Sequence, residues 1–376
     1  MTQESTIVPD SDLTSSIHAP KTTVENPNKD PLTPSTYTPN EEEQAILAHL
    51  ALAEKNRAVT SERGYNSITT LPQFTPVPIG GFPLTHASHS AQIFDFLDNQ
   101  ALLAWFQVEH PKFLVRIFDH SGKDVADKAA LLSERIRTNI AIVANFVNQE
   151  APAVKVSPPR PNGGKMAKNL PLCFLVHNIS EEATNLILSQ RIWSATNITF
   201  EAHQFNCSHP PSLLFCLSGF TTQETDTVNK TVADVWAHGD NRHQIDDILS
   251  MSEIPEDQVH KATYDLINSI RVEYLDFKVS GGLSVPRFNI FARSPTHNAQ
   301  AWTDLRSFLR SLEYPTGLDG CGSAVAVPPC TICHSIAHPR GLCPFPGIPL
   351  WNGPKSGNKN TPNAARNKGK GRNSHA

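Results

Sequence analysis

The sequence predicts an α+β protein in which a mainly antiparallel sheet with helices is preceded by a helical segment. Three observations support this fold class. Apolar runs of strand length alternate with amphipathic helical stretches between about residues 171 and 314. The early residues are rich in Ser, Thr, Pro and Asn, and the last residues in Gly, Asn and Lys. With 39% hydrophobic residues and 30 prolines, the 376-residue chain should have a packed middle and extended ends.

Residues 1–88 are expected to be disordered apart from one short helix. The first 40 residues offer little that could be buried. Glu41 to about Ala58 has acidic residues in its first turn, where the helix dipole favours them. Residues 89–156 then have a mostly helical pattern. In a helix from about Asp127 to Asn148, the apolar residues that fall near one face are Leu131, Ile136, Ile140, Ile142 and Val143.

A Pro- and Gly-rich stretch within residues 157–170 is predicted to be a linker, and residues 171–314 to be the α+β body. Its elements follow the order βαββααββα, without a repeat of fixed period. Ser180 is the expected N-cap of the first helix, which should run through Trp193. The other strands are expected at Leu172–Ile179, Ile198–Phe205, Ser212–Leu217, Val272–Val279 and Arg287–Arg293, and the other helices at Thr225–His238, Asp257–Ile270 and Ala299–Leu312.

Neither a membrane span nor a secretory signal is apparent in the sequence. No segment approaches the roughly 18–20 consecutive apolar residues of a membrane span. The first residues lack a basic start and an apolar stretch. We therefore expect no membrane association and a place in the cytoplasm or nucleus, where cysteines are thiols or metal ligands. Cys173 and Cys216 are predicted to be core residues.

The most specific motif is Cys330-x2-Cys333-x4-His338-x4-Cys343. Zn²⁺ prefers four Cys or His donors at tetrahedral corners, and these four lie within fourteen residues. Four protein ligands leave no open position, so the expected Zn²⁺ site is structural, within a module spanning about residues 328–346. His334 is also available but adjoins Cys333, and we expect it to be exposed.

This spacing is that of the retroviral-type CCHC zinc knuckle. The stretch from Cys330 to Pro346, with Trp351-Asn-Gly-Pro after it, resembles the end of Gag-like retroelement proteins of mushroom-forming fungi. The resemblance implies a protein that holds the nucleic acid of a mobile element. Thr331, however, stands where base-stacking knuckles have an aromatic residue. The apolar platform would then come from Ile332, Ile336 and Leu342, and a ring from Phe345 or Trp351.

Charge is distributed unequally along the chain. No acidic residue follows Asp319, whereas the first 319 residues hold 25 of the 32 basic residues and all 36 acidic ones. Residues 347–376 are expected to form a disordered basic tail that lies along phosphates. The expected nucleic-acid contacts are Arg340, Trp351, Lys355, Lys359, Arg366, Lys368, Lys370 and Arg372.

The predicted function is therefore non-catalytic binding of single-stranded nucleic acid, with RNA expected, and self-association through the body. One alternative is an adaptor whose knuckle docks a partner protein, and another is an inert copy. RNA binding by a sheet around Leu172–Gly219, with Phe174 and Phe215 stacking bases, is a further alternative.

We predict no enzyme. The triad residue types at Asp119-His120-Ser121 are adjacent and cannot converge, and Asn162-Gly163-Gly164-Lys165 lacks the first Gly and last Ser/Thr of a phosphate loop.

Overall fold

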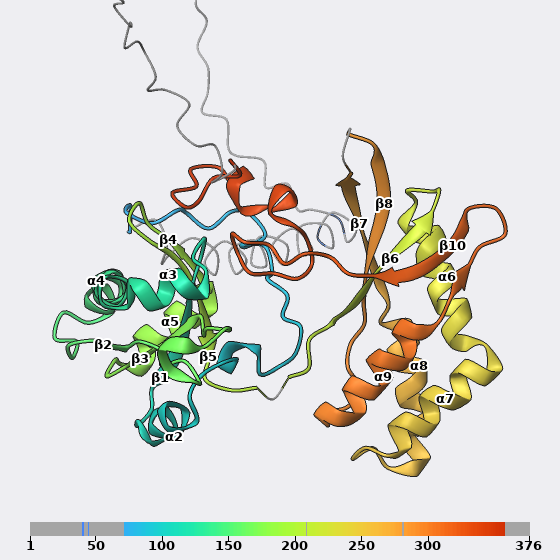
Figure 1. The fold of residues 1–376 in the computed structure, drawn as a ribbon, viewed down its shortest axis with the longest axis horizontal. Helices are drawn as coiled ribbons and strands as arrows, with labels where there is room; N and C mark the ends of the chain where they lie inside the picture. Colours follow the sequence, from blue (N-terminus) through green and yellow to red (C-terminus); the bar gives the residue numbers. More distant parts are fainter. Residues whose placement is uncertain (1–39, 41–43, 45–70, 208, 280–281, 358–376) are drawn as a thin grey trace, which may run out of the picture. The chain divides into compact units, whose positions relative to one another are not determined.

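The computed structural model describes residues 40, 44, 71–207, 209–279 and 282–357. It confirms an α+β fold. Within these residues the strands form two five-stranded antiparallel sheets (Figure 1). Residues 1–88 and 347–376 were expected to be disordered, apart from one short helix. Their described parts, 71–88 and 347–357, are instead packed: Leu71 and Phe74 lie in the first core, and Trp351 packs against Phe118 and Phe345. Nearly all the rest of both segments, including most of the expected helix at Glu41–Ala58, lies outside the described part.

The first sheet has the strand order β2-β3-β1-β5-β4. A short 3-10 helix, η1 (Gln92–Phe94), and α2 (Asn99–Gln107) precede it. Its elements, in chain order with the short η2, are β1 (Lys112–Ile117), α3 (Gly122–Asp127), α4 (Ala129–Val147), β2 (Lys155–Ser157), η2 (Gly164–Met166), β3 (Cys173–His177), α5 (Glu181–Gln190), β4 (Ile192–Ser194) and β5 (Thr199–Gln204).

The second sheet has the strand order β7-β8-β6-β10-β9. Its elements, in chain order with the short η3, are β6 (Leu213–Phe220), α6 (Thr225–Ala237), α7 (Gly239–Ser250), η3 (Glu256–Gln258), α8 (Val259–Asn268), β7 (Arg271–Lys278), β8 (Ser284–Phe291), α9 (Ala299–Ser311), β9 (Tyr314–Pro315) and β10 (Gly320–Val325).

The two sheets have the same topology. In each, a central strand is followed by helices, a two-strand hairpin, one helix and a second pair of strands, and the two strand orders correspond position by position. This is the split βαβ arrangement with one additional edge strand. We refer to residues 112–204 as the first repeat and to residues 213–325 as the second repeat. The duplication is one of element order, which explains why the sequence shows no fixed period.

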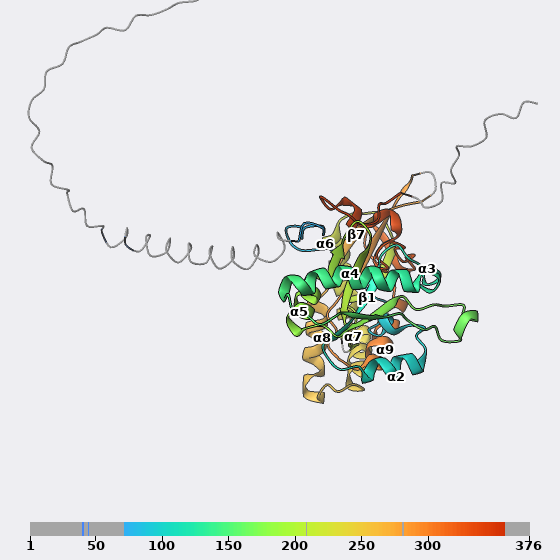
Figure 2. The same cartoon turned by 90° about the vertical axis from the view of Figure 1, so that its left-hand side faces the viewer.

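The helices that follow each central strand cover one face of its sheet. In the first repeat, Phe113, Val115 and Ile117 of β1 pack with the apolar sides of α4 and α5, and α4 crosses the sheet in the foreground of Figure 2. In the second repeat, Phe288 and Ile290 of β8 pack with α6–α9. Because side chains alternate along a strand, their neighbours face the other side of the sheet. In the first repeat α2 packs on that side, where Trp105 meets Leu114 and Leu175. In the second repeat we call it the helix-free face, because α6–α9 all pack in the core on the opposite side.

Local sequence explains several helix starts. The Ser121 hydroxyl accepts from the Asp124 backbone N–H, and the Asp124 carboxylate accepts in return from the backbone of Ser121. Ser180 caps α5 as expected, and Asn298 caps α9. These side chains satisfy amide groups that have no partner within the helix.

The structure differs from several sequence-based expectations. Residues 89–156 hold α2, α3 and α4 as a helical segment should, but they also contain β1, the central strand of the first sheet. The expected linker at 157–170 joins β2 to β3 of one sheet, so the sheets separate instead between β5 and β6. The helix after Ser180 ends at Gln190, and Trp193 belongs to β4. The strands β9 and β10 and the helix α7 were not foreseen.

Two further points concern α4 and the membrane. Leu131 is half exposed rather than facing the core, and Leu132 takes that position instead. No helix in the described part of the chain combines the length and hydropathy needed to cross a membrane.

Candidate metal centre

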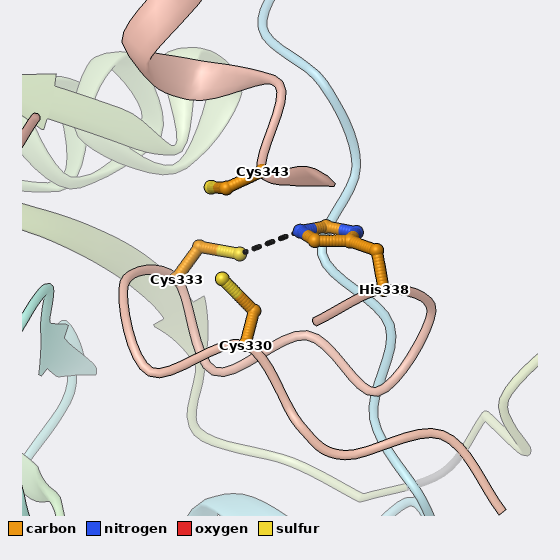
Figure 3. A group of neighbouring side chains, drawn as sticks. All are labelled: Cys330, Cys333, His338 and Cys343. Atoms are coloured by element: carbon orange, nitrogen blue, oxygen red, sulfur yellow. Dashed lines mark hydrogen bonds between the residues drawn. The ribbon is translucent and has the colours of Figure 1, made fainter. Parts of the chain in front are cut away.

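Cys330, Cys333, His338 and Cys343 come together near the C-terminal end of the described chain (Figure 3). Their ligand atoms, three Sγ and one imidazole nitrogen, all lie within 4.8 Å of one another. All four residues are buried. This cluster is the group that the spacing predicts, and it can hold a metal ion.

The backbone of the turn at Cys330 positions the first two sulfurs. The His334 N–H donates to the Cys330 carbonyl at 2.8 Å, which closes the turn. The Ile332 N–H points at the Cys330 Sγ at 3.4 Å. The short helix η4 (Arg340–Leu342) then carries the chain to Cys343. The two cysteines of one turn and two later ligands therefore approach one point from different directions.

The electrostatics of the cluster favour a bound cation. Side-chain hydrogen bonds with Cys333 and Cys343 lower the pKa of Cys330. The same contact with Cys330 raises the pKa of Cys333, and it raises that of Cys343 to about 12. Three thiolates cannot share so small a buried volume without a positive charge between them. A metal cation bound there would remove this conflict and, with four protein donors, would have no position left for a substrate.

The loop around the cluster is packed into the rest of the chain. Phe345, in the short helix η5 (Phe345–Gly347), is fully buried and meets Phe118 edge-to-face, with ring centroids 5.0 Å apart. Phe82 and Ile192 complete this apolar cluster together with the three cysteines and Ile332. The metal loop, residues 330–347, is therefore packed against the folded chain rather than being the free-standing module expected at 328–346.

His334 corrects one expectation. It is not exposed, since its ring is tucked against β1 and bonds the Ile117 carbonyl at 2.9 Å. A carbonyl only accepts, so Nε2 carries the proton. Burial lowers the pKa of His334 to about 4, which keeps the ring neutral. His338 is the histidine that the structure places among the sulfurs.

The expected nucleic-acid residues fall into three groups. Arg340 is half-buried and pairs with Asp119 at 2.6 Å. Trp351 is half-buried against Phe118 and Phe345, and its indole donates to the Pro354 carbonyl at 3.1 Å. Lys355 is exposed. The residues Lys359, Arg366, Lys368, Lys370 and Arg372 lie outside the described part of the chain.

The apolar side chains that were expected to stack on bases are mostly buried. Ile332 and Phe345 are fully buried, and Ile336 and Leu342 are half-buried. Phe174 and Phe215 belong to the helix-packed cores of the first and second repeats. Both therefore face the helices of their own core rather than the opposite side of the sheet, where stacking of bases would occur.

A buried charged pair on the face of the first sheet opposite to α4 and α5 was not foreseen from the sequence. Arg116 of β1 and Glu201 of β5 form an ion pair at 2.8 Å, with both side chains almost fully buried. The Thr85 hydroxyl donates to both Glu201 oxygens, at 2.6 and 2.7 Å. The partners are up to 116 residues apart. The only local signal was a pair of basic residues, Lys112 and Arg116, within an otherwise apolar strand.

No protein-family model, curated protein or solved structure matches the chain.

Proposed function

We propose that this protein is a non-catalytic scaffold that holds one structural Zn²⁺ and binds single-stranded nucleic acid, with RNA the expected form. The proposal of a bound metal rests on one observation: three Sγ atoms and one imidazole nitrogen are buried within 4.8 Å of one another. Thiolate and imidazole ligands in a closed four-donor shell are typical of structural zinc. The ion would stabilise a loop whose regular structure consists of two three-residue helices.

The proposal of nucleic-acid binding rests on the distribution of charge along the chain. Seven basic residues and no acidic residue follow Asp319. Arg340 is already paired with Asp119, so Lys355 and the five basic residues beyond it are the principal candidates for phosphate contact. The remainder of the chain is acidic overall and should repel phosphate. The resemblance of the metal loop to that of Gag-like proteins favours the RNA of a mobile element as the ligand.

An adaptor function for the metal loop has less support. A loop that docks a partner protein needs apolar side chains on its surface. Ile332, Ala337 and Phe345 are instead buried against the chain's own residues. The loop therefore offers little apolar surface to a second protein.

The decisive experiment compares the full chain with a variant that ends at Pro354. Binding of a fluorescent single-stranded RNA is followed by anisotropy at several salt concentrations. With about four to six phosphate contacts, the full chain should give a log–log salt slope of roughly −3 to −4, from about −0.7 per contact. The shortened chain should bind more weakly to all sequences, with a flatter slope. Equal affinity and slope in the two proteins would assign binding to the body.

A matched control separates charge from length. A full-length chain in which Lys355, Lys359, Arg366, Lys368, Lys370 and Arg372 are all replaced by Gln keeps the tail but removes its charge. It should behave like the shortened chain, because phosphate contact depends on charge rather than on a defined tail structure.

A further inference from the structure

The metal loop makes hydrogen bonds to the end of β1 in the first repeat. The Asp119 N–H donates to the Ile332 carbonyl at 2.7 Å, and the His334 ring donates to the Ile117 carbonyl at 2.9 Å. Arg340 adds its ion pair with Asp119. Three residues spread over the loop are therefore fixed to one strand end.

The same loop also bonds to the helix-free face of the second repeat. Asn289 of β8, which is fully buried, donates from Nδ2 to the Ala337 carbonyl at 2.7 Å. Ala337 packs against Leu213 and Phe291. Asn289 and Phe291 alternate along β8 with the core residues Phe288 and Ile290, so these contacts lie on the face that the helices leave open.

The two repeats otherwise have separate interiors. The first core is built from residues between 71 and 202, and the second from residues between 214 and 324. Further contact passes through the segment that precedes the first repeat. There, Arg306 of α9 donates to the Ser88 carbonyl, and the His86 ring lies 4.9 Å from that of Phe291. This segment is itself bound to the loop, because the Ile336 N–H donates to the His86 carbonyl at 3.0 Å.

We propose that the metal loop is a clasp that joins the two repeats only while its ion is bound. All four ligands lie inside the segment that bonds both to Ile117 and to Asn289. It belongs to the red part of the chain in Figure 1. The ion fixes the positions of Ile332, His334 and Ala337 relative to one another. Without it, these anchor points move independently, and the contacts to Ile117, Asp119 and Asn289 are lost. Each repeat retains its own core, so the two repeats lose this link without unfolding.

This inference rests on the proposed metal, and one experiment distinguishes the two. The full chain is prepared with one equivalent of Zn²⁺ and after treatment with EDTA, its metal content is measured, and amide hydrogen exchange is followed by mass spectrometry. After chelation, protection should fall in residues 330–338 and at Asp119. The strand pairs β1–β3 and β6–β8 should keep their protection.

Each outcome has a defined meaning. A chain that binds no zinc overturns both the proposed metal and the clasp. A chain that binds zinc but keeps its loop protected after chelation overturns the clasp alone. Loss of protection throughout both sheets would also overturn it, because the ion would then be a requirement for folding rather than a link between folded repeats.

Substitution of two buried asparagines, one at a time, tests the link between the loop and the second repeat. Asn289→Ala removes the anchor to the second repeat and leaves every metal ligand in place. Asn139→Ala is the matched control, since Asn139 is also buried and donates to the Arg135 carbonyl at 2.8 Å, but within the first repeat. With zinc bound, Asn289→Ala should raise exchange in residues 335–338 about tenfold, as expected for one lost buried hydrogen bond. Asn139→Ala should leave that exchange unchanged; equal effects of the two variants would contradict the proposal.

Discussion

The imidazole of His334 donates to the carbonyl of Ile117 at 2.9 Å, so the residue next to the ligand Cys333 is tied to the end of β1. Its backbone has φ of 63°, in the left-handed region that a residue with a side chain rarely occupies. Glycine is the ordinary solution at such a position. Here a side-chain hydrogen bond offsets the conformational cost, and this explains why a knuckle-like turn lacks glycine after its second cysteine.

The ligand assignment predicts a clear contrast between two variants. Cobalt added to the protein should give the absorption of a tetrahedral site with three thiolates. Cys343→Ser removes a ligand, so it is expected to lower metal affinity more than about 100-fold. Loss of a residue that only hydrogen-bonds a ligand typically lowers affinity by up to about that factor. His334→Gly should keep the spectrum, because His334 is not a ligand and glycine tolerates the positive φ. Equal losses in the two variants would show that His334 rather than His338 binds the metal.

The Asp119–Arg340 pair should stabilise the attachment of the loop. Both side chains are largely buried, so Asp119→Asn is expected to lower the free energy of unfolding by about 1–2 kcal/mol. Asparagine tolerates the left-handed backbone that Asp119 adopts, with φ of 56°, so the substitution tests charge rather than strain. A double-mutant cycle with Arg340→Gln, measured by urea unfolding, should give a coupling energy above zero. Strictly additive effects would mean that the two side chains do not interact in solution.

The buried Arg116–Glu201 pair predicts a specific acid sensitivity. Burial alone would raise the pKa of Glu201, but the charges of His203 and Arg116 and the Thr85 hydroxyl hold it well below its usual range. A carboxyl whose pKa is depressed by folding contributes stability above its unfolded pKa, about 4.3, and this contribution is lost as the pH falls toward the folded pKa. Glu201→Gln should therefore flatten the loss of stability below about pH 4.3.

The same variant leaves Arg116 buried without its anion, so at pH 7 it should cost about 3–5 kcal/mol. The control is Glu134→Gln, which breaks an exposed pair with Arg137 at 2.5 Å. That variant should cost less than about 1 kcal/mol. Urea unfolding at neutral and acidic pH checks both, and similar costs for the two variants would argue against the buried pair.

Gly219 of β6 is a position in the second sheet that cannot accept a side chain. Its φ is +115°, and a Cβ added there would lie 2.3 Å from the Cys321 carbonyl oxygen. Gly219→Ala should lower the free energy of unfolding by about 2 kcal/mol or more, because the strain falls on paired strands. Gly317→Ala, where a Cβ meets open space, should stay within about 0.5 kcal/mol of the natural protein. Thermal unfolding of the two variants side by side measures the difference.

The features that were predictable from sequence are the local ones. The four ligands fall within fourteen residues, so their spacing alone identified the group that the structure brings together. The helices α5, α6, α8 and α9 were found because their apolar residues follow the helical period. Most strands of the second repeat were found for the corresponding reason.

The features that were missed depend on distant partners. β1 is buried along its whole length, yet Lys112 and Arg116 interrupt its apolar pattern. Lys112 is satisfied by three backbone carbonyls at the end of α2, and Arg116 by Glu201, and neither arrangement is visible in a local window. α7 was missed because its sequence is largely polar. The burial of His334 likewise depends on Ile117, 217 residues away.

The position of the metal ligands in the chain sets an order of events during synthesis. Cys343 follows Gln204, the last residue of β5, by 139 residues. At about 5–20 residues per second, translation of that stretch takes roughly 7–28 s. During this interval the first repeat can fold, but the metal loop that covers the end of β1 has not yet been synthesised. The ion can then be bound only after both repeats have left the ribosome. A molecule that holds the metal is therefore one in which both repeats have already been synthesised.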